Sequence, residues 1–189
     1  MCEFKSLTDN LESILYSEKD LNEMLDRLGE EITEYYKESA KDRPLILVGV
    51  LKGSFIFIAD LIRRIDLPCQ VLFLRASSYG AGTESSGNVK VEKLPEAETL
   101  IGADVLLVED ILDSGRTLKK LSELFMDCGA NSVNICTMLD KPARRVADVE
   151  TKFCGFSVED QFIVGYGLDY NELYSNLPYI AILKPEAYM

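Results

Sequence analysis

The sequence contains no histidine. This absence excludes a Ser-His-Asp or Cys-His catalytic site and any metal site built on imidazole. Five cysteines, at positions 2, 69, 128, 136 and 154, include no C-x-x-C pair, and their number is odd. Neither a disulfide framework nor a zinc site is therefore expected, and a reducing, cytoplasmic environment fits best. A bound metal ion would have oxygen ligands, which favours Mg²⁺.

Long apolar runs and positive charge are also scarce. The longest clean apolar run, 45–51, is far too short to span a bilayer, and the N-terminus lacks an apolar signal-peptide core. The net charge is −12, the opposite of what a general nucleic-acid binder usually carries. An anionic substrate would have to be attracted locally, by a few cations, backbone N–H groups and a metal ion.

The composition predicts one packed domain, since 47% of 189 residues are hydrophobic. Short apolar stretches typical of buried strands occur at 44–51, 70–76, 104–109, 132–139 and 162–166. Helical patterns cover 55–65 and 117 to about 128, the second ended by Gly129. Strands that alternate with helices predict a parallel sheet in an α/β domain.

The first helix is predicted to begin at Ser17, with Asp20 in the position that completes a capping box. Its apolar face is expected to comprise Leu21, Met24, Leu25, Leu28, Ile32 and Tyr35. The segment 77–88 differs, because it is polar, holds three glycines and has no apolar period. Such a loop is usually disordered or a functional lid, and we favour the lid.

Two acids, Glu109 and Asp110, directly follow a predicted buried strand. Ligands of open α/β sheets bind beyond the carboxyl ends of strands, so this position favours a site over a merely solvated acidic pair. The loop 113–117 then leads into a helix N-terminus, where N–H groups and the helix dipole favour an anion. The same residues also fit a simpler interpretation, in which Ser114 or Asp113 caps the helix.

Two nucleotide-binding motifs are absent. No G-x-x-x-x-G-K-[ST] sequence occurs, and the glycines from Gly80 neither complete a G-x-G-x-x-G pattern nor join a strand to a helix. A P-loop triphosphatase or a Rossmann dehydrogenase is therefore not expected.

The stretch VEDILDSGRT, 108–117, closely resembles the phosphoribosyl diphosphate-binding motif of the type I phosphoribosyltransferases. Ordered matches from about residue 10 to 188 resemble the bacterial-type hypoxanthine (hypoxanthine-guanine) members of that family. They are VGVLKGSFIF (48–57), SSYGAGTESSG (77–87), LDKPARR (139–145), FIVGYGLDY (162–170) and NLPYIAILKPE (176–186).

This resemblance implies a type I phosphoribosyltransferase fold, with a central, mostly parallel sheet flanked by helices, a small hood and a mobile loop. We expect a single domain, 1–189, with a core of about 40–160 and a hood formed by about 1–20 and 160–189. The implied reaction transfers 5-phosphoribosyl from phosphoribosyl diphosphate to hypoxanthine or guanine with Mg²⁺. A homodimer or homotetramer is implied too, with no nucleic-acid or membrane partner.

The resemblance also implies residue roles. Phosphoribosyl diphosphate would be bound by Lys52, Gly53, Glu109, Asp110, Asp113, Ser114, Gly115, Arg116 and Thr117. The purine would be bound by Lys141, Phe162, Ile163 and Asp169. Asp113 would be the general base, Mg²⁺ would be held by Glu109, Asp110 and Asp169, and the lid would include Ser78 and Tyr79. In relatives the peptide before the residue matching Lys52 is cis, and an arginine stands where this chain has Ser175.

Two other functions are considered. A regulator could keep the sugar-phosphate site and lose catalysis, since some type I relatives bind RNA, but the acidic balance and Asp113 argue against it. A transferase could instead prefer xanthine or a pyrimidine. Lys141 beside Phe162 favours a 6-oxopurine over uracil or adenine and leaves xanthine open.

Overall fold

The computed structural model describes residues 7–78, 89–91 and 97–188. Tyr79, a residue of the predicted lid, and the rest of the predicted loop through residue 88 lie outside the described residues. Among the helices that are described, none has the length and apolar composition that crossing a membrane requires.

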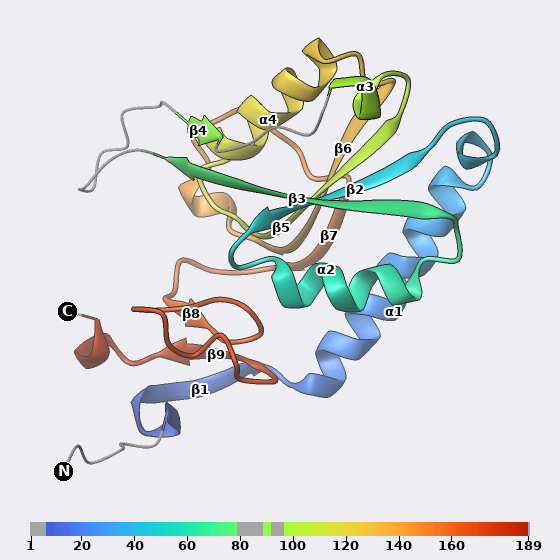
Figure 1. Ribbon diagram of the computed structural model, residues 1–189. Coiled ribbons are helices and arrows are strands. Elements are labelled where there is room, and N and C mark those ends of the chain that lie inside the picture. The colour runs from blue at the N-terminus through green and yellow to red at the C-terminus, as the bar shows by residue number, and fades with distance from the viewer. Residues whose placement is uncertain (1–6, 79–88, 92–96, 189) are drawn as a thin grey trace.

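Strands and helices alternate through the middle of the chain (Figure 1). The strands are β1 (Leu11–Tyr16), β2 (Leu45–Leu51), β3 (Cys69–Ser78), β4 (Val89–Val91), β5 (Asp104–Leu112), β6 (Ser132–Asp140), β7 (Phe153–Ser157), β8 (Ile163–Val164) and β9 (Ile180–Leu183). The α-helices are α1 (Glu18–Tyr36), α2 (Phe55–Leu61), α3 (Ala97–Leu100) and α4 (Arg116–Asp127).

The main sheet has the strand order β4-β3-β2-β5-β6-β7. Neighbouring strands from β3 to β7 pair in parallel, and β4 pairs antiparallel with the outer edge of β3. The predicted parallel α/β sheet is therefore confirmed, with one antiparallel edge strand added. Because β2 pairs with both β3 and β5, the strand order reverses there, and the carboxyl ends of β2 and β5 form a switch point where ligands bind in such sheets.

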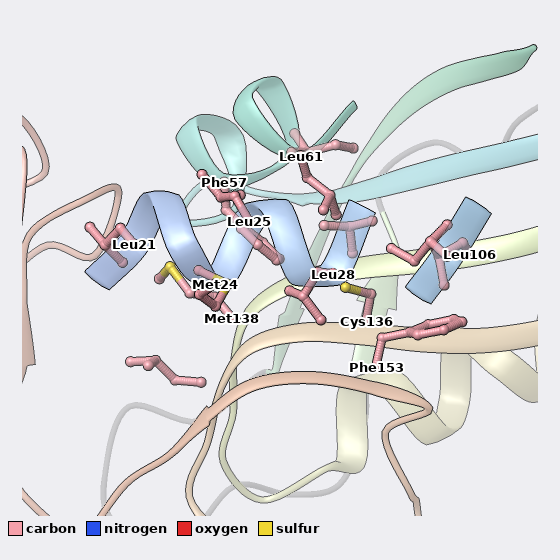
Figure 2. Close-up of a cluster of buried hydrophobic side chains, with 14 of the residues drawn as sticks. Leu21, Met24, Leu25, Leu28, Phe57, Leu61, Leu106, Cys136, Met138 and Phe153 are labelled. Carbon is pink, nitrogen blue, oxygen red and sulfur yellow. The ribbon is translucent and has the colours of Figure 1, made fainter. Parts of the chain in front are cut away.

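Both faces of the sheet are covered (Figure 1). Alternate residues of β2 point to opposite sides, so Leu45 and Leu47 pack with α1 and α2, whereas Ile46 and Val48 pack with α3 and α4. Figure 2 shows side chains of α1 and α2 meeting those of the strands in the first of these clusters. Burial on both faces explains why the central strands read as continuous apolar runs.

Helix α1 begins as predicted, because Ser17 and Asp20 form the reciprocal hydrogen bonds of a capping box. The predicted apolar face is wrong at its last position. Tyr35 is 48% exposed and Tyr36 is 1% exposed. The buried Tyr36 hydroxyl accepts a hydrogen bond from the Asn134 amide at 2.8 Å, which satisfies its polar group inside the core.

A second, smaller sheet has the order β1-β9-β8 and lies beside the main sheet (Figure 1). It joins the two ends of the described chain, because β1 pairs antiparallel with β9. The apolar stretch predicted as a strand at 162–166 forms a strand only at Ile163–Val164, and no pattern predicted β1, β7 or β9. The division into one core and a hood stays a prediction.

Candidate active site

The sequence predicted that Glu109 and Asp110 follow the strand. This is wrong, because both acids lie inside β5. The strand continues to Leu112 because β6 extends the pairing, with Glu109 opposite Thr137 and Leu112 opposite Asp140. The acids still occupy the carboxyl end of the sheet, next to β2.

The two carboxyl groups are withdrawn from solvent. Asp110 is 8% exposed, and Glu109 Oε2 is buried without a hydrogen-bond partner among the described residues. Burial, followed by the neighbouring charge of Asp110, raises the pKa of Glu109 well above its usual range. Burial likewise raises the pKa of Asp110, against hydrogen bonds from Glu109 and from the Ile111 N–H that lower it. Such a pair is suited to accept hydroxyl donors or a cation that supplies the missing partner.

The loop after β5, which the sequence predicts as an anion-binding cradle, leads into α4. Gly115, with φ of +78°, is the N-cap of α4, so the alternative of a Ser114 or Asp113 cap is wrong. Gly115 has no side chain to cap the first turn, which leaves N–H groups there to other acceptors. A Cβ at Gly115 would lie 2.5 Å from Val149 Cγ1, so both backbone angle and space require glycine there. A hollow of about 80 Å³ is lined by Glu109, Ile111, Leu112, Asp113, Ser114, Gly115, Thr117 and Leu118.

Arg145 anchors the loop 113–117 through hydrogen bonds. Its guanidinium donates to the carbonyl oxygens of Asp113 at 3.1 Å and Val149 at 3.0 Å, and it forms an ion pair with Asp140. The backbone of Asp113 is thus tied down, while its side-chain Oδ1 is buried without a hydrogen-bond partner among the described residues. An anchored backbone with an unused carboxylate oxygen fits a proton acceptor.

The loop after β2 packs directly on the acids. The Leu51–Lys52 peptide is cis, as the family resemblance implied. A Cβ at Gly53 would lie 1.6 Å from Asp110 Oδ2, and a Cβ at Gly167 would lie 2.2 Å from the Gly53 carbonyl oxygen. Only glycine fits at either position, because the Gly53 backbone packs on the Asp110 side chain and the Gly167 backbone packs on the Gly53 carbonyl.

Lys141 follows β6 and is 6% exposed. Its N–H donates to the Leu112 carbonyl at 3.0 Å, which places it beside the loop of Asp113. Its ammonium donates to the Gln161 carbonyl at 2.8 Å and lies 3.6 Å from Asp160. The buried ammonium is therefore directed at the segment that contains Phe162.

Phe162 is half-buried, and Ile163 behind it is buried. The Phe162 ring stacks on Tyr188 with centroids 4.5 Å apart and meets the edge of Tyr170 at 5.2 Å. A ring held in this way by two others is a rigid surface for a planar ligand.

Asp169 belongs to a turn that faces the acids. It is exposed, its charge contributes to the raised pKa of Asp110, and its Oδ2 accepts from the Glu172 N–H at 3.1 Å.

The half-buried Ser175 accepts through its carbonyl oxygen from the Gly167 N–H at 3.0 Å. The position where the family resemblance implies an arginine is thus hydrogen-bonded to the turn that packs on Gly53.

The described residues include no ready cluster of three or more His, Cys, Asp or Glu side chains that could hold a metal ion. Mg²⁺ at phosphate sites is usually bound by one or two carboxylates together with substrate oxygens and water. The pair Glu109 and Asp110, with a buried oxygen of Glu109 that has no partner among the described residues, fits that donor set.

The structure brings most predicted site residues to the carboxyl edge of the sheet. Arg116 and Thr117 open α4 beside the cradle, and Ser78 ends β3. Residues that the sequence did not single out individually are Asp140, Arg145, Asp160, Gly167 and Glu172. Only the match of LDKPARR to the family could have pointed to Arg145, since its contacts lie up to 33 residues away.

Three comparisons agree with this geometry. The family described as phosphoribosyl transferase domain matches residues 18–171. A hypoxanthine-guanine phosphoribosyltransferase of Staphylococcus epidermidis is 50% identical over 179 residues, covering 95% of this chain and 97% of the relative. One from Staphylococcus aureus is 47% identical over 180 residues, covering 95% and 98%. A crystal structure of a hypoxanthine phosphoribosyltransferase from Staphylococcus aureus superposes with a TM-score of 0.90 at 46% identity, covering 99% of this chain and all of that one.

Proposed function

The chain belongs to the phosphoribosyl transferase domain family. From that premise we propose which residues bind each substrate and which take part in the reaction. The enzyme transfers 5-phosphoribosyl from phosphoribosyl diphosphate to hypoxanthine or guanine, giving IMP or GMP and diphosphate in purine salvage. One observation carries the assignment of the site. The two acids of β5, the start of α4 after Gly115 and the buried ammonium of Lys141 all lie at one edge of the sheet.

The sugar diphosphate would bind over the end of β5. The 5′-phosphate would accept from N–H groups and hydroxyls of the loop 113–117, where the helix dipole favours an anion. Glu109 and Asp110 would accept from the two ribose hydroxyls, which supplies Glu109 Oε2 with a partner. Lys52 and the Gly53 backbone would face the diphosphate.

The purine would lie between Lys141 and Phe162. Lys141 would donate to the exocyclic oxygen at C6, Phe162 would stack on the ring, and Ile163 would offer backbone groups to its edge. As the bond from the anomeric carbon to diphosphate breaks, positive charge builds on the sugar, as in glycoside chemistry. The purine nitrogen N9 then bonds to that carbon, and Asp113 takes the proton from N7.

Mg²⁺ is the proposed cofactor: Glu109 and Asp110 would hold one ion and Asp169 a second, each together with substrate oxygens, and the bound metal would neutralise charge on the leaving diphosphate. The segment 77–88, with Ser78 and Tyr79, is proposed as the lid that excludes water.

A cytoplasmic homodimer or homotetramer is proposed as the working form. Three large apolar side chains, Phe55, Phe73 and Leu173, are 46%, 51% and 54% exposed and are available to an interface.

The direct test is turnover of hypoxanthine, guanine, xanthine and adenine with phosphoribosyl diphosphate and Mg²⁺. Hypoxanthine and guanine should both be substrates, and adenine should not, because an amino group at C6 cannot accept from the Lys141 ammonium. The turnover of xanthine measures how strongly the site discriminates between purines that differ at C2. Equal use of adenine would contradict the proposed role of Lys141.

Ser175→Arg should lower KM for phosphoribosyl diphosphate by about tenfold and leave KM for the purine little changed. An arginine would add a charged fork where serine offers one neutral hydroxyl, and charge-assisted bonds to phosphate are about twice as strong as neutral ones. Steady-state kinetics with each substrate varied in turn measures the effect.

Ser175→Lys is the matched control, since it adds the charge without the fork, and its effect should be smaller. Unchanged constants in both variants would mean that this position does not face the diphosphate.

A further inference from the structure

The ammonium of Lys52 is occupied by a carboxylate of this chain. Lys52 Nζ lies 2.7 Å from Glu172 Oε1 and 2.6 Å from Oε2, so both oxygens contact it. The two residues are 120 positions apart, and the contact joins the loop after β2 to the turn after β8. Both side chains are mostly exposed, at 53% and 77%, so the pair is weak and easily opened.

The backbone around Glu172 holds this carboxylate at Lys52. Asn171 and Glu172, with φ of +52° and +63°, form a two-residue turn closed by hydrogen bonds between Tyr170 and Leu173. Asparagine followed by glycine is the favoured pair in such turns, so a glutamate in the second position costs backbone energy. The Glu172 N–H also donates to Asp169, which ties the turn to the acidic site.

The charge balance on this side of the site makes the contact consequential. Position 175, where the family resemblance implies an arginine, is a serine here and adds no positive charge. A phosphate oxygen and a carboxylate oxygen compete for the same ammonium, because Lys52 is a point charge and not a fork.

We propose that Glu172 acts as a built-in competitor of the substrate: its carboxylate occupies Lys52 and must be displaced when phosphoribosyl diphosphate binds. Glu172 is then a residue that sets affinity for the diphosphate group, and it re-pairs with Lys52 as diphosphate leaves. This inference rests on the proposed role of Lys52.

The test is Glu172→Gln, which removes the charge and keeps the shape. KM for phosphoribosyl diphosphate and the inhibition constant of product diphosphate should both fall about two- to fivefold, the range expected for an exposed ion pair. KM for the purine should not move. Glu38→Gln is the matched control, because Glu38 is an exposed partner of Lys41 at 2.8 Å, and it should change neither constant.

Lys52→Met separates this inference from the proposed function. In its background Glu172→Gln should have no further effect. An unchanged or raised KM in Glu172→Gln overturns the inference, as does an effect that persists without Lys52 or appears equally in the control. If Lys52→Met alone leaves KM for phosphoribosyl diphosphate unchanged, the proposed role of Lys52 fails and this inference fails with it.

Discussion

Asp113→Asn should lower kcat by about 10²–10⁴, the usual contribution of a general acid or base. Asparagine has nearly the same shape as aspartate, but its amide cannot take a proton from N7 of the purine. The loop should keep its conformation, because Arg145 holds residue 113 through the carbonyl oxygen of its backbone. The carboxylate oxygen that loses its function is buried without a partner among the described residues, so no hydrogen bond to a described residue is broken at that atom.

The measurement is steady-state turnover with hypoxanthine, together with direct titration of phosphoribosyl diphosphate. Binding of the sugar diphosphate should survive, which distinguishes a chemical role from a collapsed loop. Asp127→Asn, at the exposed far end of α4, is the matched control and should leave kcat unchanged. Near-normal turnover in Asp113→Asn would remove Asp113 from the role of base.

Gly53→Ala should lower kcat/KM for phosphoribosyl diphosphate by about 10²-fold. The added Cβ would lie 1.6 Å from Asp110 Oδ2 and 2.5 Å from Asp110 Cγ. Asp110 is 8% exposed and hydrogen-bonded to the Ile111 N–H at 2.9 Å, so its carboxyl has little freedom to move aside. Either the carboxyl or the Lys52 loop is displaced by about 1 Å or more, and misplacement on that scale can cost about 10² in rate.

The kinetic effect is to be compared with Gly102→Ala. Gly102 has φ of +72° and nothing within 4 Å of an added Cβ, so alanine there strains the backbone without touching the site. The control should lower the melting temperature while leaving kcat/KM per folded molecule intact. Normal kinetics in Gly53→Ala would mean that Asp110 need not occupy its observed position.

Local sequence patterns were sufficient to predict the central strands and the parallel sheet that they form. The continuous apolar run of β2 predicted a strand buried on both faces, and the alternation of such runs with helices predicted the parallel sheet. Ser17 and Asp20 predicted the start of α1, because the capping box is made within four residues. The loop after β5 and the helix that follows it were predicted for the same reason, since Gly115 and the helix are neighbours in the chain.

The sequence by itself therefore determined the α/β class, the central strands and, through ordered family motifs, the reaction. Tertiary structure decided which of Tyr35 and Tyr36 is buried, since the partner of the buried Tyr36 hydroxyl is Asn134, 98 positions away in the chain. It also decided that Gly53 packs on Asp110 and that Glu172 pairs with Lys52. Such contacts join residues far apart in the chain, and propensity and periodicity act only between near neighbours.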